Sequence, residues 1–278
     1  MAIVGAGDIG GTCAQALASH DLIGHILVID AAVNAAAGKA LDIQQAGAIS
    51  GVHARLEATD DETRAIGCAA YVVADRFAAG SPEWQGEEGL ALIKRLAGAS
   101  PDSPIVFAGA TQTALIQTSS REAPIPARRL IGSAPEALAS AVAAIVAMEA
   151  GCSPDDVAVA VLGTPPAFIV PWSDASIAGC ALERVVSQVE LRRIEARVAR
   201  LWPPGPYALG AAAGRVVEAM LQDSRRSYNV ETVLGAEFGV RDRVGAVPAV
   251  LASHGVAHTR VPALNTRERV QLDTVLGV

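Results

Sequence analysis

Short, continuous apolar runs alternate in the first half of the chain with longer stretches in which apolar residues recur every three or four positions. Such a run is typical of a strand buried on both faces of a parallel sheet, and the longer stretches are typical of covering helices. We expect strands at Ala2–Val4, Ile26–Asp30, Ala54–Ala58, Ala70–Ala74, Ile105–Ala108 and Leu130–Gly132. We expect helices at Ile9–Ser19, Asn34–Ala46, Glu87–Ala97 and Gln112–Ser119. This alternation predicts an α/β fold with a doubly wound parallel sheet.

The pattern changes in the second half, which opens with a long Ala-rich helix expected at Glu136–Ala150. Further strands are expected at Val157–Leu162, Phe168–Val170, Val230–Leu234 and Ala246–Leu251. Further helices are expected at Leu191–Leu201, Ala208–Leu221 and Asn265–Leu276. Because this half is α+β in pattern, we place a domain boundary near Gly132–Pro135. The expected domains are residues 1–132 and 133–278.

A glycine-rich turn joins the first expected strand to the first expected helix, with Gly5, Gly7 and Gly10 in a G-x-G-x-x-G pattern. The first glycine permits a tight turn, the second lets a diphosphate approach the backbone, and the third lets helix and strand pack closely. The free N–H groups at the helix start would hold the diphosphate, so Asp8 and Ile9 are included in the expected cofactor site. The alternative is that the glycines only shape a turn.

Asp30 ends the second expected strand, where a carboxylate would accept both hydroxyls of an adenosine ribose and repel a 2′-phosphate. The pattern therefore favours NAD over NADP as the cofactor. Asp8 is negative and close to the expected diphosphate, or it acts instead as a helix N-cap that faces away.

The composition excludes several classes of protein. Among 278 residues, 22 Lys and Arg stand against 29 Asp and Glu, which gives a net charge of −7 and argues against a nucleic-acid partner. No apolar run reaches the roughly 18 residues of a membrane span, and no basic leader precedes Gly5, so we expect neither membrane insertion nor export. The 4 cysteines lie far apart, which favours reduced thiols in the cytoplasm and gives no metal-ligand spacing.

Several motifs occur in a fixed order over nearly the whole length. The residues 38–43 read GKALDI, and the second half carries VPW at 170–172, GAEFG at 235–239, GAVP at 245–248 and PALN at 262–265. In this order the chain resembles the lactate/malate dehydrogenase family. The resemblance implies an NAD-binding Rossmann domain followed by an α+β C-terminal domain, and an oxidoreductase acting on 2-hydroxy carboxylic acids. It also implies a homodimer or homotetramer that associates partly through the helix carrying residues 38–43.

The family's chemistry requires a His that exchanges a proton with the substrate, an Asp that orients this His, and Arg residues that bind the substrate carboxylate. By resemblance these positions are occupied here by Pro165, Leu138 and Ala141. The Arg-bearing lid of the family corresponds to residues 81–86, and its T-A-G stretch after the fourth strand corresponds to residues 74–76. We therefore do not expect lactate or malate turnover.

Two hypotheses remain open. In the first, the chain binds a dinucleotide and a small molecule for a different reaction, with Asp75 and Arg76 as catalytic candidates; alternatively, these two side chains pair with each other or lie in solvent. In the second, the chain is a non-catalytic binding or regulatory protein that keeps the fold. A further possibility is that Asp8 and Arg76 take up the space of the cofactor.

Overall fold

A parallel sheet forms the first half of the protein. The computed structural model describes residues 1–20, 22–80 and 82–277. The parallel strands are β1 (Ala2–Val4), β2 (His25–Ile29), β3 (Arg55–Thr59), β4 (Tyr71–Val73), β5 (Ile105–Phe107) and β6 (Leu130–Gly132). Their order is β3-β2-β1-β4-β5-β6, and every neighbouring pair is parallel. The predicted doubly wound α/β fold is thus confirmed, with strand ends within a residue of the expected ones.

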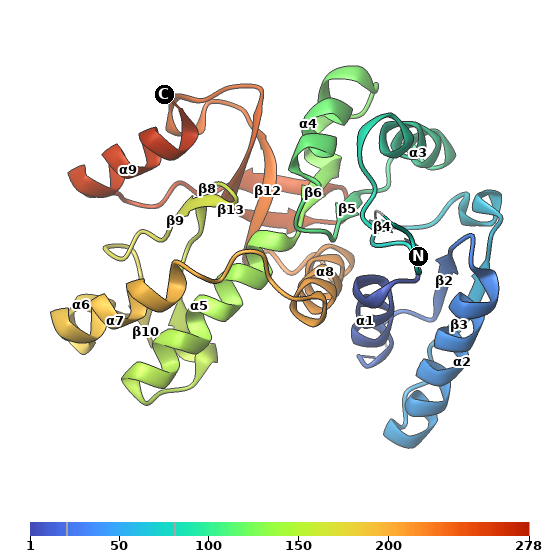
Figure 1. Ribbon diagram of the computed structural model, residues 1–278, viewed down its shortest axis with the longest axis horizontal. Helices are drawn as coiled ribbons and strands as arrows, with labels where there is room; N and C mark the ends of the chain where they lie inside the picture. The colour runs from blue at the N-terminus through green and yellow to red at the C-terminus, as the bar shows by residue number, and fades with distance from the viewer. Residues whose placement is uncertain (21, 81, 278) are drawn as a thin grey trace.

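Helices cover both faces of this sheet (Figure 1). They are α1 (Asp8–Ala18), α2 (Val33–Ser50), α3 (Gly86–Ala99) and α4 (Thr113–Glu122). The core divides accordingly, since alternate strand residues point to opposite faces. Ile3 and Val72 pack with α1, whereas Val4 and Tyr71 pack with α3 and α4.

The sheet continues into the second half with antiparallel strands. These are β12 (Ser227–Leu234), β13 (Arg243–Ala252), β8 (Leu162–Thr164), β9 (Ala167–Ile169) and β14 (Gly255–Thr259). The connection is made where Glu231 of β12 pairs with Gly132 of β6. The helices of this half are α5 (Ala134–Ala150), α6 (Leu182–Val185), α7 (Gln188–Val198), α8 (Pro206–Leu221) and α9 (Thr266–Leu276).

The single strand expected at Val157–Leu162 is wrong. Its ends belong to two sheets, because β7 (Val157–Ala158) joins β10 (Ser176–Ile177) and β11 (Cys180–Ala181) in a small separate sheet, whereas β8 joins the main one. Between them the Val161 N–H donates to the side chain of Asn229 instead of to a neighbouring strand. The pattern also missed β10, β11 and β14, which are short or partly exposed.

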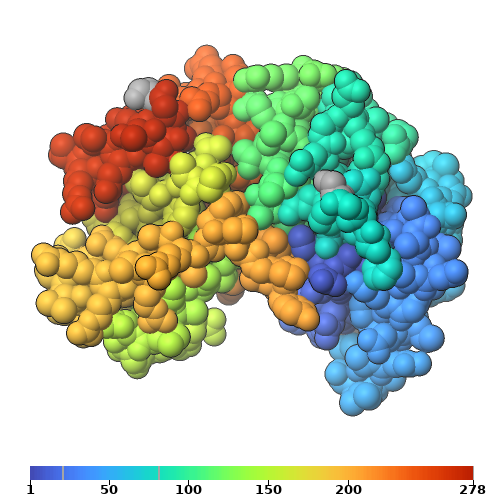
Figure 2. Space-filling model, viewed as in Figure 1, coloured from blue at the N-terminus to red at the C-terminus, as the bar shows by residue number. Residues whose placement is uncertain are grey.

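Helix α8 of the second half lies directly against α1 of the first (Figure 1). The contact is close because α8 presents glycines there: a Cβ on Gly210 would lie 2.6 Å from the Ile9 carbonyl oxygen, and one on Gly214 would lie 3.0 Å from the Ala16 Cβ. Figure 2 shows the resulting continuous surface between the orange and dark blue parts of the chain. The position of α1, and with it the glycine-rich turn, therefore depends on both halves.

In the described part of the chain no helix combines the length and the apolar character needed to span a bilayer.

Candidate functional site

The glycine-rich turn has the geometry that its sequence requires. Gly5 adopts a positive φ of 112°, Gly7 is the N-cap residue of α1, and a Cβ on Gly10 would collide with the Gly5 carbonyl oxygen. The turn therefore brings the end of β1 and the start of α1 as close together as the fingerprint predicts. The N–H groups of Gly7, Asp8 and Gly10 point to one side of this turn, since all three donate to the same residue.

That residue is Asp75, two positions after the end of β4. Its Oδ2 atom accepts from the Asp8 N–H at 2.9 Å, and its Oδ1 atom accepts from the Gly10 N–H at 3.0 Å. Its backbone oxygen accepts from the Gly7 N–H at 2.8 Å. Asp75 is only 8% exposed, and a Cβ on Gly7 would collide with its carboxylate. A carboxylate of the protein thus takes the place at the helix N-terminus that favours an anion.

Asp30 lies beside it and is also fully engaged. Its Oδ2 atom accepts from the N–H groups of Ala6 at 2.7 Å and Phe77 at 3.0 Å, and its Oδ1 atom accepts from the Ala32 N–H at 2.8 Å. Asp30 is 7% exposed. The chain just after Asp75 therefore covers the carboxylate that was expected to bind a ribose.

We refer to residues 75–80 and 82–84 as the groove segment; Ser81, which begins the predicted lid, lies outside the described residues. Glu83 accepts from the backbone N–H groups of Ala110 at 3.1 Å and Thr111 at 2.9 Å, in the loop after β5. Asp75 and Glu83 form an antiparallel bridge, and the Arg76 N–H donates to the Pro82 oxygen at 2.7 Å. The groove segment thus runs over the carboxyl ends of β1, β4 and β5.

The interpretation that Asp75 and Arg76 pair with each other or lie in solvent is wrong. Asp75 binds the start of α1, as described, and the Arg76 guanidinium pairs with Glu88 at 2.8 Å and lies 4.6 Å from the centre of the Trp84 ring. The reason is that β4 ends before Asp75, so the chain turns across the sheet edge and directs the two side chains to opposite sides.

The prediction of Asp8 as a helix N-cap is also wrong, because Gly7 holds that position. The Asp8 side chain is 79% exposed and lies 3.6 Å from the Lys39 ammonium. It therefore faces away from the expected diphosphate and does not take up its space. The Lys39 ammonium donates to the Gly7 carbonyl oxygen at 2.7 Å, which fixes the turn from the other side.

The fingerprint provides the donors that a diphosphate needs, but the arrangement does not leave them available. Asp75 uses three of these N–H groups, and Phe77 covers Asp30. In this conformation the residues present do not accommodate a dinucleotide, and we derive no hydride-transfer step through one.

The positions that resemble the family's catalytic residues lie in the second half. Pro165 is in the turn between β8 and β9, and Leu138 and Ala141 are on α5, with Leu138 fully buried. The 5 histidines, His20, His25, His53, His254 and His258, are in other segments of the sequence. None of them belongs to the β8–β9 turn.

Two buried carboxylates were missed by the sequence reasoning. Glu231 on β12 is completely buried, accepts from the Thr113 hydroxyl at 2.7 Å, and has its pKa raised to about 7 by that burial. Burial likewise raises the pKa of Glu136 on α5, which accepts from the Asn229 N–H at 2.9 Å and faces Arg215 at 3.5 Å. For Glu231 the available signal was an acidic residue inside the strand expected at Val230–Leu234.

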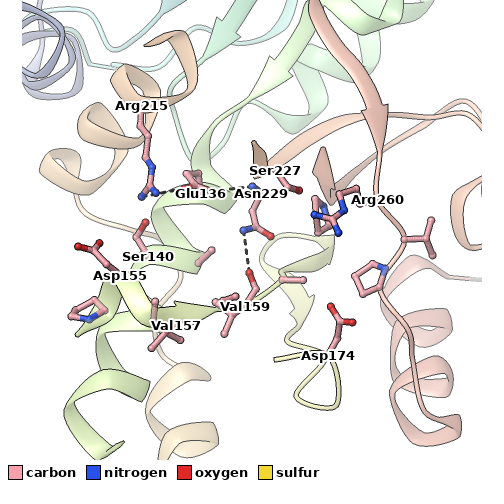
Figure 3. A pocket seen from close by; sticks show the side chains of 18 of the residues that line it. Glu136, Ser140, Asp155, Val157, Val159, Asp174, Arg215, Ser227, Asn229 and Arg260 are labelled. Atoms are coloured by element: carbon pink, nitrogen blue, oxygen red, sulfur yellow. Dashed lines mark hydrogen bonds and ion pairs between the residues drawn. The ribbon is translucent and has the colours of Figure 1, made fainter. Parts of the chain in front are cut away.

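Glu136 and Asn229 also line a cavity of about 610 Å³ in the second half (Figure 3). Its charged lining combines Asp155 and Asp174 with Arg215 and Arg260. The side chain of Asn229 donates to the Val159 oxygen at 3.3 Å and so ties the wall of the cavity together. The charges of the lining are mixed in sign, and the Glu136 carboxylate is already paired with Arg215. We therefore assign no ligand to this cavity.

The structure offers no metal centre in residues 1–20, 22–80 and 82–277, where no group of three or more His, Cys, Asp or Glu side chains is placed to hold an ion.

Comparison with known proteins agrees with the fold. Residues 1–100 match the family model described as lactate/malate dehydrogenase, NAD binding domain. The chain is 28% identical to malate dehydrogenase of Roseiflexus sp. (strain RS-1), covering 96% of this chain and 92% of that protein. It is 26% identical to malate dehydrogenase of Cytophaga hutchinsonii, covering 99% and 93%. The solved malate dehydrogenase structure from Salinibacter ruber superposes with a TM-score of 0.87 over 99% of this chain and 93% of that one, at 22% identity, which shows a common fold.

Proposed function

We propose that the chain is an NAD-binding member of the lactate/malate dehydrogenase family whose 2-hydroxyacid dehydrogenase activity is altered or lost. The family match over residues 1–100 and the likeness to malate dehydrogenases support this. The observation that carries the proposal is Pro165 in the β8–β9 turn, where the family resemblance places a His. A proline ring has no group that can accept or donate a proton. The general acid–base step of the family has no counterpart at this position.

The other two substitutions act in the same direction. Leu138 and Ala141 on α5 replace an Asp that would orient the His and an Arg that would bind the substrate carboxylate. General acid–base catalysis typically contributes about 10²–10⁴-fold, and a charged clamp contributes further stabilisation of the bound acid. Loss of all three groups is therefore expected to lower turnover of malate or lactate by many powers of ten.

NAD is the cofactor that the family match and the malate dehydrogenase relatives support. The preference over NADP rests on Asp30, which would repel a 2′-phosphate at the ribose. We propose residues 1–132 as the dinucleotide-binding domain and residues 133–278 as the companion domain. Lys39 lies on α2 within the first of these.

The test is a steady-state assay of NAD reduction with malate and lactate, and of NADH oxidation with the matching oxo acids. We expect NAD binding by calorimetry without turnover above the buffer control, and no recovery with a wider set of hydroxy acids. Robust turnover of either acid would contradict the assignment of Pro165, Leu138 and Ala141.

A second candidate function is a non-catalytic binding or regulatory role. The joint replacement of His, Asp and Arg favours it, since a new reaction at the same site would be expected to retain part of the machinery. Absence of turnover over a broad panel of acids, together with retained NAD binding, would separate it from an altered enzyme.

We also propose a homodimer or homotetramer, and a cytoplasmic location suited to the free thiols of Cys13, Cys68, Cys152 and Cys180.

A further inference from the structure

We propose that Asp75 is an internal occupant of the diphosphate cradle, so that a dinucleotide can bind only when the groove segment leaves the carboxyl end of the sheet. The ligand-free protein is then self-inhibited. The inference rests on the proposed NAD-binding function, because it concerns what competes with NAD for the same donors.

The donors at the start of α1 that a diphosphate needs are already occupied. The N–H groups of Asp8 and Gly10 each donate to a different oxygen of the Asp75 carboxylate, at 2.9 and 3.0 Å. These groups start α1, where the helix dipole and the unpaired N–H groups together favour an anion. A diphosphate would need the same groups. It cannot share them with a buried carboxylate of like charge.

The space beside Gly7, which a diphosphate would enter, is also occupied. The Asp75 carboxylate lies so close to Gly7 that even a methyl group on Gly7 would collide with it. Gly7 is the residue whose missing side chain is expected to admit the diphosphate. The gap that this glycine opens is therefore filled by Asp75.

The groove segment also covers the place where the ribose is expected to bind. The Phe77 N–H donates to the Asp30 Oδ2 atom at 3.0 Å, and the Phe77 ring lies 5.5 Å below the Lys39 ammonium. Ribose hydroxyls could reach Asp30 only after this N–H has left. One short segment thus covers both places where the sequence predicts cofactor contacts, and both must open together.

The groove segment can leave this position without breaking the main sheet. It lies between β4, which ends at Val73, and α3, which begins at Gly86, and adds no strand to the sheet order. Besides the contacts of Asp75 and Phe77, it is attached through Glu83 to the loop after β5, through the ion pair of Arg76 with Glu88 on α3, and through Trp84, which packs against the core. The Asp75–Glu83 bridge and the stacking of Arg76 on Trp84 lie within the segment and can move with it. Ala78 within it adopts a left-handed φ of 51°, which disfavours this conformation for a residue with a side chain.

The test replaces Asp75 with Ala, which is the residue of the family's T-A-G stretch at this position. We expect calorimetric titration to give a Kd for NAD at least tenfold lower in Asp75→Ala than in the wild type, and Asp75→Asn to fall between them. Inorganic pyrophosphate serves as a second probe and should show the same order. The matched control is Glu190→Ala, which removes a carboxylate that accepts from the Ser187 N–H at 2.7 Å at the start of α7 in the second half. It should leave the Kd unchanged.

A second measurement follows tryptophan fluorescence in the wild type, so that its main signal does not depend on the stability of a variant. Trp84 belongs to the groove segment, so NAD or pyrophosphate should change its fluorescence, and Trp84→Phe should remove that change. NAD binding with equal Kd in wild type and Asp75→Ala, or without a change in Trp84 emission, would overturn the self-inhibition while leaving NAD binding intact. Absence of NAD binding in both proteins would instead overturn the proposed function and the inference with it.

Discussion

At the scale of single residues, the site is decided by where a few carboxylates are buried. Asp75, Asp30 and Glu83 each accept from two or more backbone N–H groups, so their charge is compensated inside the protein. Glu231 differs, because its one hydrogen bond described here comes from the Thr113 hydroxyl. A buried carboxylate with so little compensation costs stability when it is ionised.

Glu231→Gln should therefore change how stability depends on pH. The pKa of Glu231 is raised from 4.5 to about 7 in the folded protein. The folded state thus binds the proton more tightly than the unfolded chain does. The stability that this proton binding contributes is fully present below pH 4.5 and is lost as the pH rises through about 7. Urea unfolding should show the variant more stable than the wild type by at most about 3 kcal/mol at pH 8, with the difference vanishing toward pH 4. Two curves that stay parallel across this range would contradict the buried, uncompensated state of Glu231.

The same scale shows what sequence could not predict about the site. The fingerprint residues Gly5, Gly7 and Gly10 were recognisable because each needs a local backbone geometry, and local geometry follows from local sequence. The position of Asp75 was not, since a carboxylate after a buried strand has many possible partners. Which one it takes depends on the path of residues 76–80 and 82–84, which contact the loop after β5 through Glu83.

At the scale of elements, the apolar runs predicted every strand of the parallel sheet because a strand buried on both faces must be apolar throughout. The partly exposed β10, β11 and β14 carry no such run and were missed. The packing of helices was predictable only in part. The glycines of α8 were visible in the sequence, but only the structure shows that they face α1.

Gly210→Ala tests that contact. Its Cβ would lie 2.6 Å from the Ile9 oxygen and 2.9 Å from the Cys13 nitrogen, so α1 and α8 would have to separate. We expect a loss of about 1–3 kcal/mol in the free energy of unfolding by urea. The control is Gly98→Ala on α3, where a Cβ meets nothing within 4 Å and the higher helix propensity of Ala should add about 0.5 kcal/mol. Equal behaviour of the two variants would show that α8 does not pack on α1 in this way.

At the scale of the whole molecule, α2 lies at the edge of the fold and much of its surface is exposed (Figure 1). Of its side chains only Ala36 and Ala40 are buried, whereas Leu41 is 56% and Ile49 is 90% exposed. This helix carries the GKALDI stretch through which the family resemblance implies association. In the proposed homodimer or homotetramer, a second copy of the chain would cover these exposed apolar side chains.

Leu41→Glu should shift the assembly toward the monomer, because a charge would be buried without a partner in the contact between copies. Size-exclusion chromatography with light scattering of wild type and variant measures this directly. Val270→Glu, at an exposed apolar position of α9, is the matched control and should keep the wild-type mass. A monomeric wild type, or an oligomeric Leu41→Glu, would contradict association through α2.

The contact between Gly7 and Asp75 bears on how such a chain is recognised at all. Since a side chain at position 7 would collide with the Asp75 carboxylate, the folded protein requires glycine there whether or not any nucleotide ever enters. A glycine fingerprint in a relative of this protein is then no sign of an open cofactor groove. The residue two places after the fourth strand is the more informative one: a small apolar residue leaves the N–H groups free for a ligand, and a carboxylate marks a turn that the protein has filled from within.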